Sequence, residues 1–232
     1  FIEYFSKGIK NLNQLKIGVE HERFLFEGEN KNRISYETLK KLFENLKVNG
    51  WEPLHEKGNI IGMQRNKQQI TTEPGLQCEL SGAPLENIHQ VCSESSKFLK
   101  EIETASKSLD VNTVSIGFDP FNSLSDIPQS PKSRYKIMTK EMPKGGKQSL
   151  EMMYRTCGIQ INYDYTSEEN FEKIFRLGNY LTPLTIALYS NSPFESGQPV
   201  GYYSYRNKVW QNTSRGGIMP IAFEKVSFEK YF

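Results

Sequence analysis

Cysteine and histidine are scarce in this sequence of 232 residues, which contains three of each. An odd number of cysteines without a C-x-x-C spacing is typical neither of a disulfide framework nor of a structural zinc site. The histidines, His21, His55 and His89, are far apart along the chain, so no histidine cluster competes for a metal. We therefore expect the cysteines to be small buried side chains and any metal site to use oxygen ligands.

Long hydrophobic runs and an excess of charge of one sign are also absent. The apolar runs fall well short of the roughly 20 residues that a membrane-spanning helix requires, and the first residues lack the pattern of a signal peptide. The formal net charge is +2, with acids and bases interspersed, which leaves no basic patch for nucleic acid. We expect a cytoplasmic protein that binds small molecules and neither nucleic acid nor a membrane.

The length is sufficient for a substantial core, and we expect a single domain over residues 1–232. The sequence begins with Phe1 instead of a methionine and ends without a helix stop signal or a polar tail. The domain is therefore expected to be an incomplete portion of a longer chain, present as a monomer or a homodimer.

Hydrophobic patterns predict strands and helices in irregular order. We expect strands over residues 15–26, 76–81, 111–118, 155–165 and 219–223, and a hairpin over 51–68. We expect helices over residues 35–48, 84–105, 134–142, 167–188 and 201–210, with Ser35, Pro84 and Ser167 at helix-start positions. Because there are neither regular βαβ units nor a Gly-rich first turn, the prediction is an α+β fold, with a mainly antiparallel sheet covered by helices on one face.

Three of the expected strands carry polar residues at every second position. On each strand these residues share one face, opposite to the apolar face that packs under the helices. They are Glu20 and Glu22, Gln77 and Glu79, and Gln160 and Asn162. Glu73, just before the Pro74-Gly75 turn, adds a fourth carboxylate to the same surface. Four neighbouring carboxylates repel one another, and Mg²⁺, which binds carboxylate and phosphate oxygens, would stabilise them.

An E-x-E pair is by itself a weak motif, since such pairs are common on solvated strands. The surrounding sequence is more specific: residues 17–22 read IGVEHE, and residues 73–85 read EPGLQCELSGAPL. Further blocks follow in order at residues 116–120, 134–138, 153–157, 191–194 and 206–210. Together they resemble the glutamate–cysteine ligase family of the plant and proteobacterial type.

This resemblance implies an ATP-dependent ligase that joins the γ-carboxyl of L-glutamate to the amine of L-cysteine, the first step of glutathione biosynthesis. It also implies a fold similar to that of glutamine synthetase, in which helices cradle a curved antiparallel sheet. The implied substrates are glutamate, cysteine and ATP, and the implied cofactor is Mg²⁺. By the same resemblance, its ligands against the ATP phosphates are Glu20, Glu22, Glu73 and Glu79.

The resemblance and the residue types point to the same two arginines. Arg134 and Arg206 are the candidate catalytic and substrate-binding residues, since a guanidinium group matches a carboxylate with two parallel hydrogen bonds. Surface salt bridges are the alternative interpretation of both arginines. The resemblance also suggests Tyr135 for the pocket of the cysteine side chain. The remaining candidates are Gln160, Asn162 and Trp210 for the substrates, and Lys136 and Arg155 for the phosphates.

Two alternatives stay open at this point. One is a related γ-glutamyl ligase that uses a different amine acceptor. The other is a non-catalytic fragment that binds glutamate or nucleotide.

Overall fold

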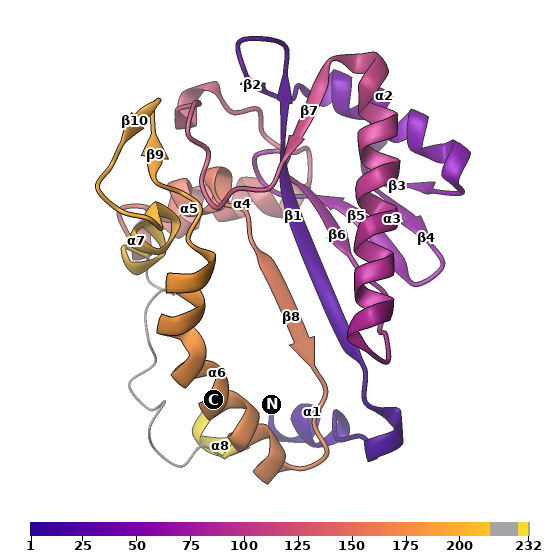
Figure 1. The fold of residues 1–232 in the computed structure, drawn as a ribbon, viewed down its shortest axis with the longest axis vertical. Coiled ribbons are helices and arrows are strands. Elements are labelled where there is room, and N and C mark those ends of the chain that lie inside the picture. Colours follow the sequence, from indigo (N-terminus) through magenta and orange to yellow (C-terminus); the bar gives the residue numbers. More distant parts are fainter. Residues whose placement is uncertain (214–226, 232) are drawn as a thin grey trace.

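The computed structural model describes residues 1–213 and 227–231. In this part of the chain an eight-stranded antiparallel sheet forms the centre of the molecule, as Figure 1 shows. Six strands follow the order β2-β1-β6-β5-β4-β3, and β7 and β8 also pair with β1. Their bounds are Ile17–Glu27 (β1), Asn32–Arg33 (β2), Glu52–Glu56 (β3), Asn59–Arg65 (β4), Gln68–Thr72 (β5), Cys78–Ser81 (β6), Val111–Val114 (β7) and Ile159–Tyr163 (β8).

Strand β1 links the two sides of the sheet. It is 11 residues long, and its first half pairs with β6 on one edge and β8 on the other. Its second half pairs with β2 and β7. Because β1 lies between β6 and β8, a side chain in its first half has neighbours from two distant parts of the sequence.

Helices α2 and α3 pack on one face of the sheet (Figure 1). The shared core includes Leu42 and Phe43 of α2, Ile102 of α3, and Ile70 and Leu80 of the sheet, all of them buried. The helices are Ile2–Lys7 (α1), Tyr36–Leu46 (α2), Ile88–Ser106 (α3), Ser133–Glu141 (α4), Ser149–Arg155 (α5), Glu168–Tyr189 (α6), Tyr205–Gln211 (α7) and Phe228–Tyr231 (α8). A small hairpin of β9 (Phe194–Glu195) and β10 (Gln198–Pro199) lies outside the main sheet.

The predicted α+β class and the antiparallel sheet are confirmed. Ser35 caps α2 and Ser167 caps α6, each accepting a hydrogen bond from the backbone N–H three residues later. The hairpin expected over residues 51–68 is present as β3 and β4 and continues into β5. The strand expected over residues 219–223 lies outside the described residues.

The predicted start of α3 at Pro84 is wrong. Leu85 exchanges two backbone hydrogen bonds with Ile17 and so continues the extended chain. The helix begins at Ile88, after Asn87, whose side chain accepts a hydrogen bond from the Gln90 N–H at 3.0 Å. An Asn side chain at this position satisfies an N–H group that the first helical turn leaves unpaired. Cys78 and Cys157 are buried as expected, whereas Cys92 on this helix is exposed.

The strand expected over residues 155–165 is shorter and less covered than the pattern indicates. Arg155 ends α5, and β8 begins only at Ile159. The apolar side of β8 was expected to pack under helices, yet Ile159, Ile161 and Tyr163 are all more than half exposed. Among the described strands β8 pairs with β1 alone and is therefore an edge of the sheet. None of the described helices is long and apolar enough to cross a membrane.

Candidate active site

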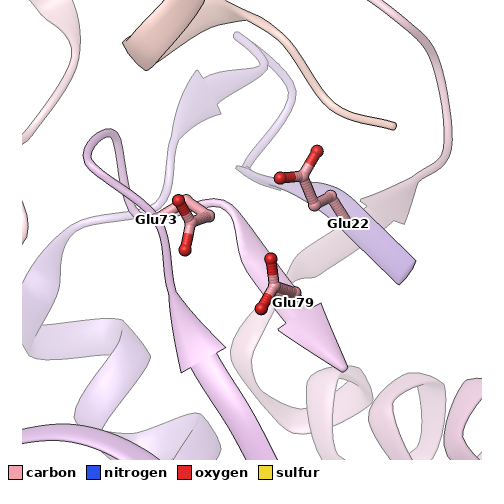
Figure 2. A group of neighbouring side chains, drawn as sticks. All are labelled: Glu22, Glu73 and Glu79. Atoms are coloured by element: carbon pink, nitrogen blue, oxygen red, sulfur yellow. The ribbon is translucent and has the colours of Figure 1, made fainter. Parts of the chain in front are cut away.

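Three carboxylates converge on the sheet face opposite to α2 and α3. Glu22 of β1 and Glu79 of β6 are direct partners in the antiparallel register. Glu73 follows the end of β5, in the turn that leads into β6. One oxygen from each of the three side chains lies within 4.8 Å of the other two, and Figure 2 shows the side chains directed toward one another.

The turn that carries Glu73 is fixed by local geometry. The Leu76 N–H donates to the Glu73 carbonyl at 2.9 Å, and Leu76 has a φ of 60°. Gly75 is packed so closely that a Cβ would lie 2.8 Å from both Ile127 Cγ2 and the Tyr154 carbonyl oxygen. Glycine is therefore required here for close approach and not for an unusual φ.

Gln77 was expected beside Glu79 on the open face, and this prediction is wrong. Strand β6 begins only at Cys78, so Gln77 belongs to the turn and its side chain is buried. Its amide nitrogen donates to the carbonyls of Met153 and Thr156, and its amide oxygen accepts from the Gly75 N–H. Gln77 thus ties the turn that carries Glu73 to α5.

Arg33 holds the same turn and was not found by sequence reasoning. Its side chain is fully buried, and its guanidinium group donates to the carbonyl oxygens of Gly75 and Tyr154. It also pairs with buried Asp119 at 3.3 Å and lies over the Phe24 ring. A buried charge needs such partners to offset the loss of hydration. The Arg33–Asp119 pair therefore supports the backbone directly behind the carboxylates.

Electrostatics show that the three carboxylates strain one another. Burial, together with the charges of Glu73 and Glu79, raises the pKa of Glu22 to about 7. The Gly158 N–H, which donates to Glu22 at 2.6 Å, opposes that rise. The pKa of Glu73 is also raised, by burial and by Glu79. A cation among the three oxygens would allow all of them to be ionised.

Glu20 lies farther along β1, outside this group of three. It faces Gln160 on β8 and Ser81 on β6 in the register. Its carboxylate accepts a hydrogen bond from the Asn162 side-chain amide at 3.1 Å. The structure thus brings Glu20, Gln160 and Asn162 to one neighbourhood. Both amides are exposed.

Arg134 and Tyr135 reach the carboxylates from α4. The Tyr135 ring is buried, and its hydroxyl lies 3.0 Å from the Thr72 carbonyl oxygen and 3.1 Å from a Glu73 oxygen. Arg134 donates to this hydroxyl at 2.7 Å and lies 3.8 Å from Glu73. The Arg134 side chain is 62% exposed, so it is open to solvent beside Glu73.

Arg206 and Trp210 approach from α7. The Arg206 guanidinium lies 5.2 Å from the Trp210 ring centroid and so close to Gly158 that a Cβ there would be 2.7 Å from Nη2. Burial lowers the pKa of Arg206, and the charge of Glu22 opposes this shift. The Arg206 Nε–H and the Trp210 Nε1–H are buried and have no hydrogen-bond partner among the described residues.

Arg155 and Lys136 are placed differently. Arg155 is buried in a network of its own, paired with Glu151 at 2.9 Å and Glu195 at 3.1 Å. It also lies over the Phe118 ring. Lys136 is exposed on α4. The contacts described for these two residues do not include the carboxylate group, and their predicted phosphate-binding roles stay predictions.

Lys132 is a second residue that the sequence reasoning missed. It precedes α4 and is buried, with 7% of its surface exposed. Its ammonium nitrogen lies 5.6 Å from the centroid of the Tyr135 ring. Burial lowers its pKa, while the charges of Glu73 and Glu79 act in the opposite direction. The proximity of Lys132 to Arg134 and Tyr135 in the sequence was the available signal.

The sequence of the chain is similar to those of known proteins. The model of the glutamate–cysteine ligase family 2 matches residues 16–232. The chloroplastic glutamate–cysteine ligase A of Oryza sativa subsp. japonica is 40% identical over 99% of this chain and 48% of its own length. The chloroplastic glutamate–cysteine ligases of Medicago truncatula and Arabidopsis thaliana are 41% and 40% identical, over 99% of this chain and 46% and 45% of theirs.

The chain spans about half the length of these curated relatives. Both the family-model match and the pairwise similarity extend over β1, the Glu73 turn, α4 and α7. The chain belongs to the glutamate–cysteine ligase family 2.

Proposed function

We propose that this chain carries the carboxylate and arginine part of the active site of an ATP-dependent glutamate–cysteine ligase. The observation that carries the proposal is the group of Glu22, Glu73 and Glu79, flanked by Arg134 and Arg206, in a chain of this family. The substrates are L-glutamate, L-cysteine and ATP. The product is γ-glutamylcysteine, so the reaction begins glutathione biosynthesis.

Magnesium is the metal that the donor set favours. The three side chains offer only carboxylate oxygen, the ligand type of hard divalent ions, and their oxygens already lie within 4.8 Å of one another. The pKa values of Glu22 and Glu73 are raised, as expected for carboxylates that share a cation site and have no cation between them. When bound, Mg²⁺ would offset the charge of the ATP phosphates and hold them in place. Glu20 is the candidate for a further ligand beside Asn162.

The reaction needs two displacements. A γ-carboxylate oxygen of glutamate attacks the γ-phosphorus of ATP, forming an O–P bond while the P–O bond to ADP breaks. The cysteine nitrogen then attacks the γ-carbonyl carbon, so that a C–N bond forms, the C–O bond to phosphate breaks, and the nitrogen loses a proton. Positioning of the reactants and stabilisation of charge supply most of the catalysis in such a reaction.

Arg206 and Trp210 are suited to hold a carboxylate of glutamate. Their two buried N–H donors, which have no partner in the part of the chain that the structure describes, carry a cost unless a ligand accepts their hydrogen bonds. Both donors belong to α7, and Arg206 lies close enough to Glu22 for their charges to interact. Arg134 faces the open side next to Glu73, where it can hold the other carboxylate or the developing phosphate charge. Tyr135 positions Arg134 through the 2.7 Å hydrogen bond.

The test uses the full-length protein with ATP, Mg²⁺ and glutamate. With cysteine we expect phosphate release and a product with the mass of γ-glutamylcysteine, and with other amines much less of either. Glu73→Gln should remove the magnesium-dependent turnover. Equal rates with several amines would refute the cysteine specificity while leaving a γ-glutamyl ligase, and no phosphate release with any amine would refute the ligase activity.

Domain extent, assembly and compartment stay predictions. We propose that residues 1–232 form a portion of one catalytic domain, in a protein that is a monomer or a homodimer. The sequence favoured the cytoplasm, whereas the relatives named above are chloroplastic ligases. Cell fractionation of the native protein distinguishes the two compartments.

A further inference from the structure

Lys132 is a buried cation that the substrate roles above leave unexplained. Only 7% of its surface is exposed, yet no hydrogen bond or ion pair joins its ammonium group to any of the described residues. The ammonium nitrogen lies over the face of the Tyr135 ring, 5.6 Å from its centroid. Its ammonium nitrogen is not among the fully buried polar atoms of the described residues that lack a partner, so it still meets solvent and can reach an anion there.

The Lys132 ammonium group lies near the carboxylates, with the Tyr135 ring beside it. Tyr135 presents its ring to Lys132 and to Arg134, whose guanidinium lies 4.8 Å from the same centroid. The Tyr135 hydroxyl in turn lies 3.1 Å from Glu73. Among the acids whose charges act on Lys132, Glu73 has the largest effect, followed by Glu79. Lys132 and Arg134 thus flank one ring at the edge of the carboxylate group, the first buried and the second exposed.

Glu73 lies too far from Lys132 to form an ion pair, because none within 4.0 Å is present among the described residues. An ammonium group that is near enough to these carboxylates for their charges to act on it, without pairing with them, suits an anion that also binds a cation held by the carboxylates. A phosphate group has this property, because its oxygens accept hydrogen bonds from ammonium groups and bind Mg²⁺. The carboxylates of glutamate already have Arg206 and Arg134 as proposed partners.

Building on the proposed function, we propose that Lys132 binds the γ-phosphoryl group of ATP and remains bound to it during its transfer to glutamate. The ammonium group donates to an equatorial phosphoryl oxygen and is not consumed. Arg134 then binds the glutamate carboxylate, and Lys132 binds the phosphoryl group that is transferred. The competing role for Lys132 is a purely structural one, in which its charge only balances Glu73 and Glu79.

The experiment compares two nucleotides that differ in the γ-phosphoryl group. Calorimetry with Mg²⁺ measures the affinity of the full-length protein for AMP-PNP, a non-hydrolysable ATP analogue, and for ADP. In Lys132→Met we expect the affinity for AMP-PNP to fall about thirty-fold, as for loss of one charge-assisted hydrogen bond, and that for ADP by less than about three-fold. Lys140→Met, a substitution of an exposed lysine on α4, should change neither affinity.

Equal losses for the two nucleotides, or no loss for either, would overturn the role of Lys132 and favour charge balance. Lys132→Gln, which keeps a polar side chain of similar reach, should give the same selective loss, and thermal unfolding followed by circular dichroism checks that both variants fold. Failure of the proposed function gives a different result, because the wild-type protein would then bind neither magnesium nucleotide.

Discussion

Glu22 on β1 and Glu79 on β6 are directly opposed across an antiparallel strand pair. Two like charges at such a position destabilise the sheet, because directly opposed side chains are close neighbours in space. Glu73 adds a third carboxylate to the same group. The sheet therefore contains a local electrostatic strain at its centre, and relief of that strain by a cation couples metal binding to stability.

The pH dependence of stability should report the strain at Glu22. Its pKa is about 7 in the folded chain against a reference of 4.5, so between these values the folded state retains a proton that the unfolded state has lost. The free energy of unfolding should therefore fall as the pH rises through this window, by about 1 to 3 kcal/mol, and the Glu22 contribution should level off above it. Urea unfolding at pH 5 and pH 8, with EDTA present, measures the change. Glu22→Gln should lack this component, and an identical pH dependence in both proteins would contradict the assignment.

Removal of the Glu79 carboxylate should weaken metal binding more than removal of the Glu20 carboxylate. Glu79→Gln removes an oxygen from the group of three, whereas Glu20→Gln removes a carboxylate that already has the Asn162 amide as a partner. We expect Mn²⁺ affinity, followed by electron paramagnetic resonance, to fall about ten-fold or more for Glu79→Gln and less for Glu20→Gln. Equal losses would show that Glu20 and Glu79 are equivalent ligands.

Arg33→Met should destabilise the chain strongly. It leaves Asp119 buried without its cationic partner and removes the hydrogen bonds to the Gly75 and Tyr154 carbonyls. Breaking a buried pair of this kind costs about 3 to 5 kcal/mol. Urea unfolding measures the loss, and Lys67→Met, in an exposed turn, is the control, with a change of less than about 0.5 kcal/mol. A small effect of Arg33→Met would mean that the turn carrying Glu73 is held by other contacts.

Arg206→Ala should raise the KM for glutamate about ten- to one-hundred-fold, with a smaller effect on the KM for ATP, because it removes a charged donor to the substrate carboxylate. Trp210→Phe, which removes only one neutral donor, should have a smaller effect in the same direction. Steady-state kinetics of the full-length protein measure both. An unchanged KM for glutamate in Arg206→Ala would remove this residue from the substrate site.

Gly158→Ala should also weaken glutamate binding, although it replaces no charged side chain. The added Cβ would lie 2.7 Å from Arg206 Nη2, so the guanidinium must move. We expect a several-fold rise in the KM for glutamate and little change in stability. Gly178→Ala on α6 is the matched control, since no atom lies within 4 Å of its added Cβ, and it should stabilise the helix by up to about 1 kcal/mol. A KM equal to that of the wild type would show that Arg206 tolerates the displacement.

The alternation of side chains on strands was sufficient to predict how Glu22 and Glu79 are placed. Glu79 lies on the face opposite to its buried neighbours Cys78 and Leu80, and the period of two carries that information within a single strand. Glu22 is the direct partner of Glu79 across the strand pair. The same rule failed at Gln77, because the strand begins two residues later than the pattern indicates. Strand boundaries depend on pairing with another segment, and a local pattern does not contain the register.

Arg33 and Lys132 could not be recognised from the sequence for a related reason. Arg33 contacts Gly75, Asp119 and Tyr154, which are 42, 86 and 121 residues away along the chain. Lys132 is distinguished by its burial beside Glu73, which only the folded chain creates. Residues that support a site through tertiary contacts carry no local periodicity and are seen only when distant segments have been placed.

The position of β1 between β6 and β8 also has a consequence for the order of folding. The pairing of β1 with β6 joins Glu22 to Glu79 across a loop of moderate length, whereas the contact between Glu22 and Gly158 spans 136 residues. Closing the longer loop costs more chain entropy, so contacts of that kind form later. We expect the β1–β6 pair, with Glu22 and Glu79, to assemble first. Helix α7, which approaches Gly158 through Arg206, should dock onto it later. The carboxylates and Arg206 would then reach their places in the site at different times during folding.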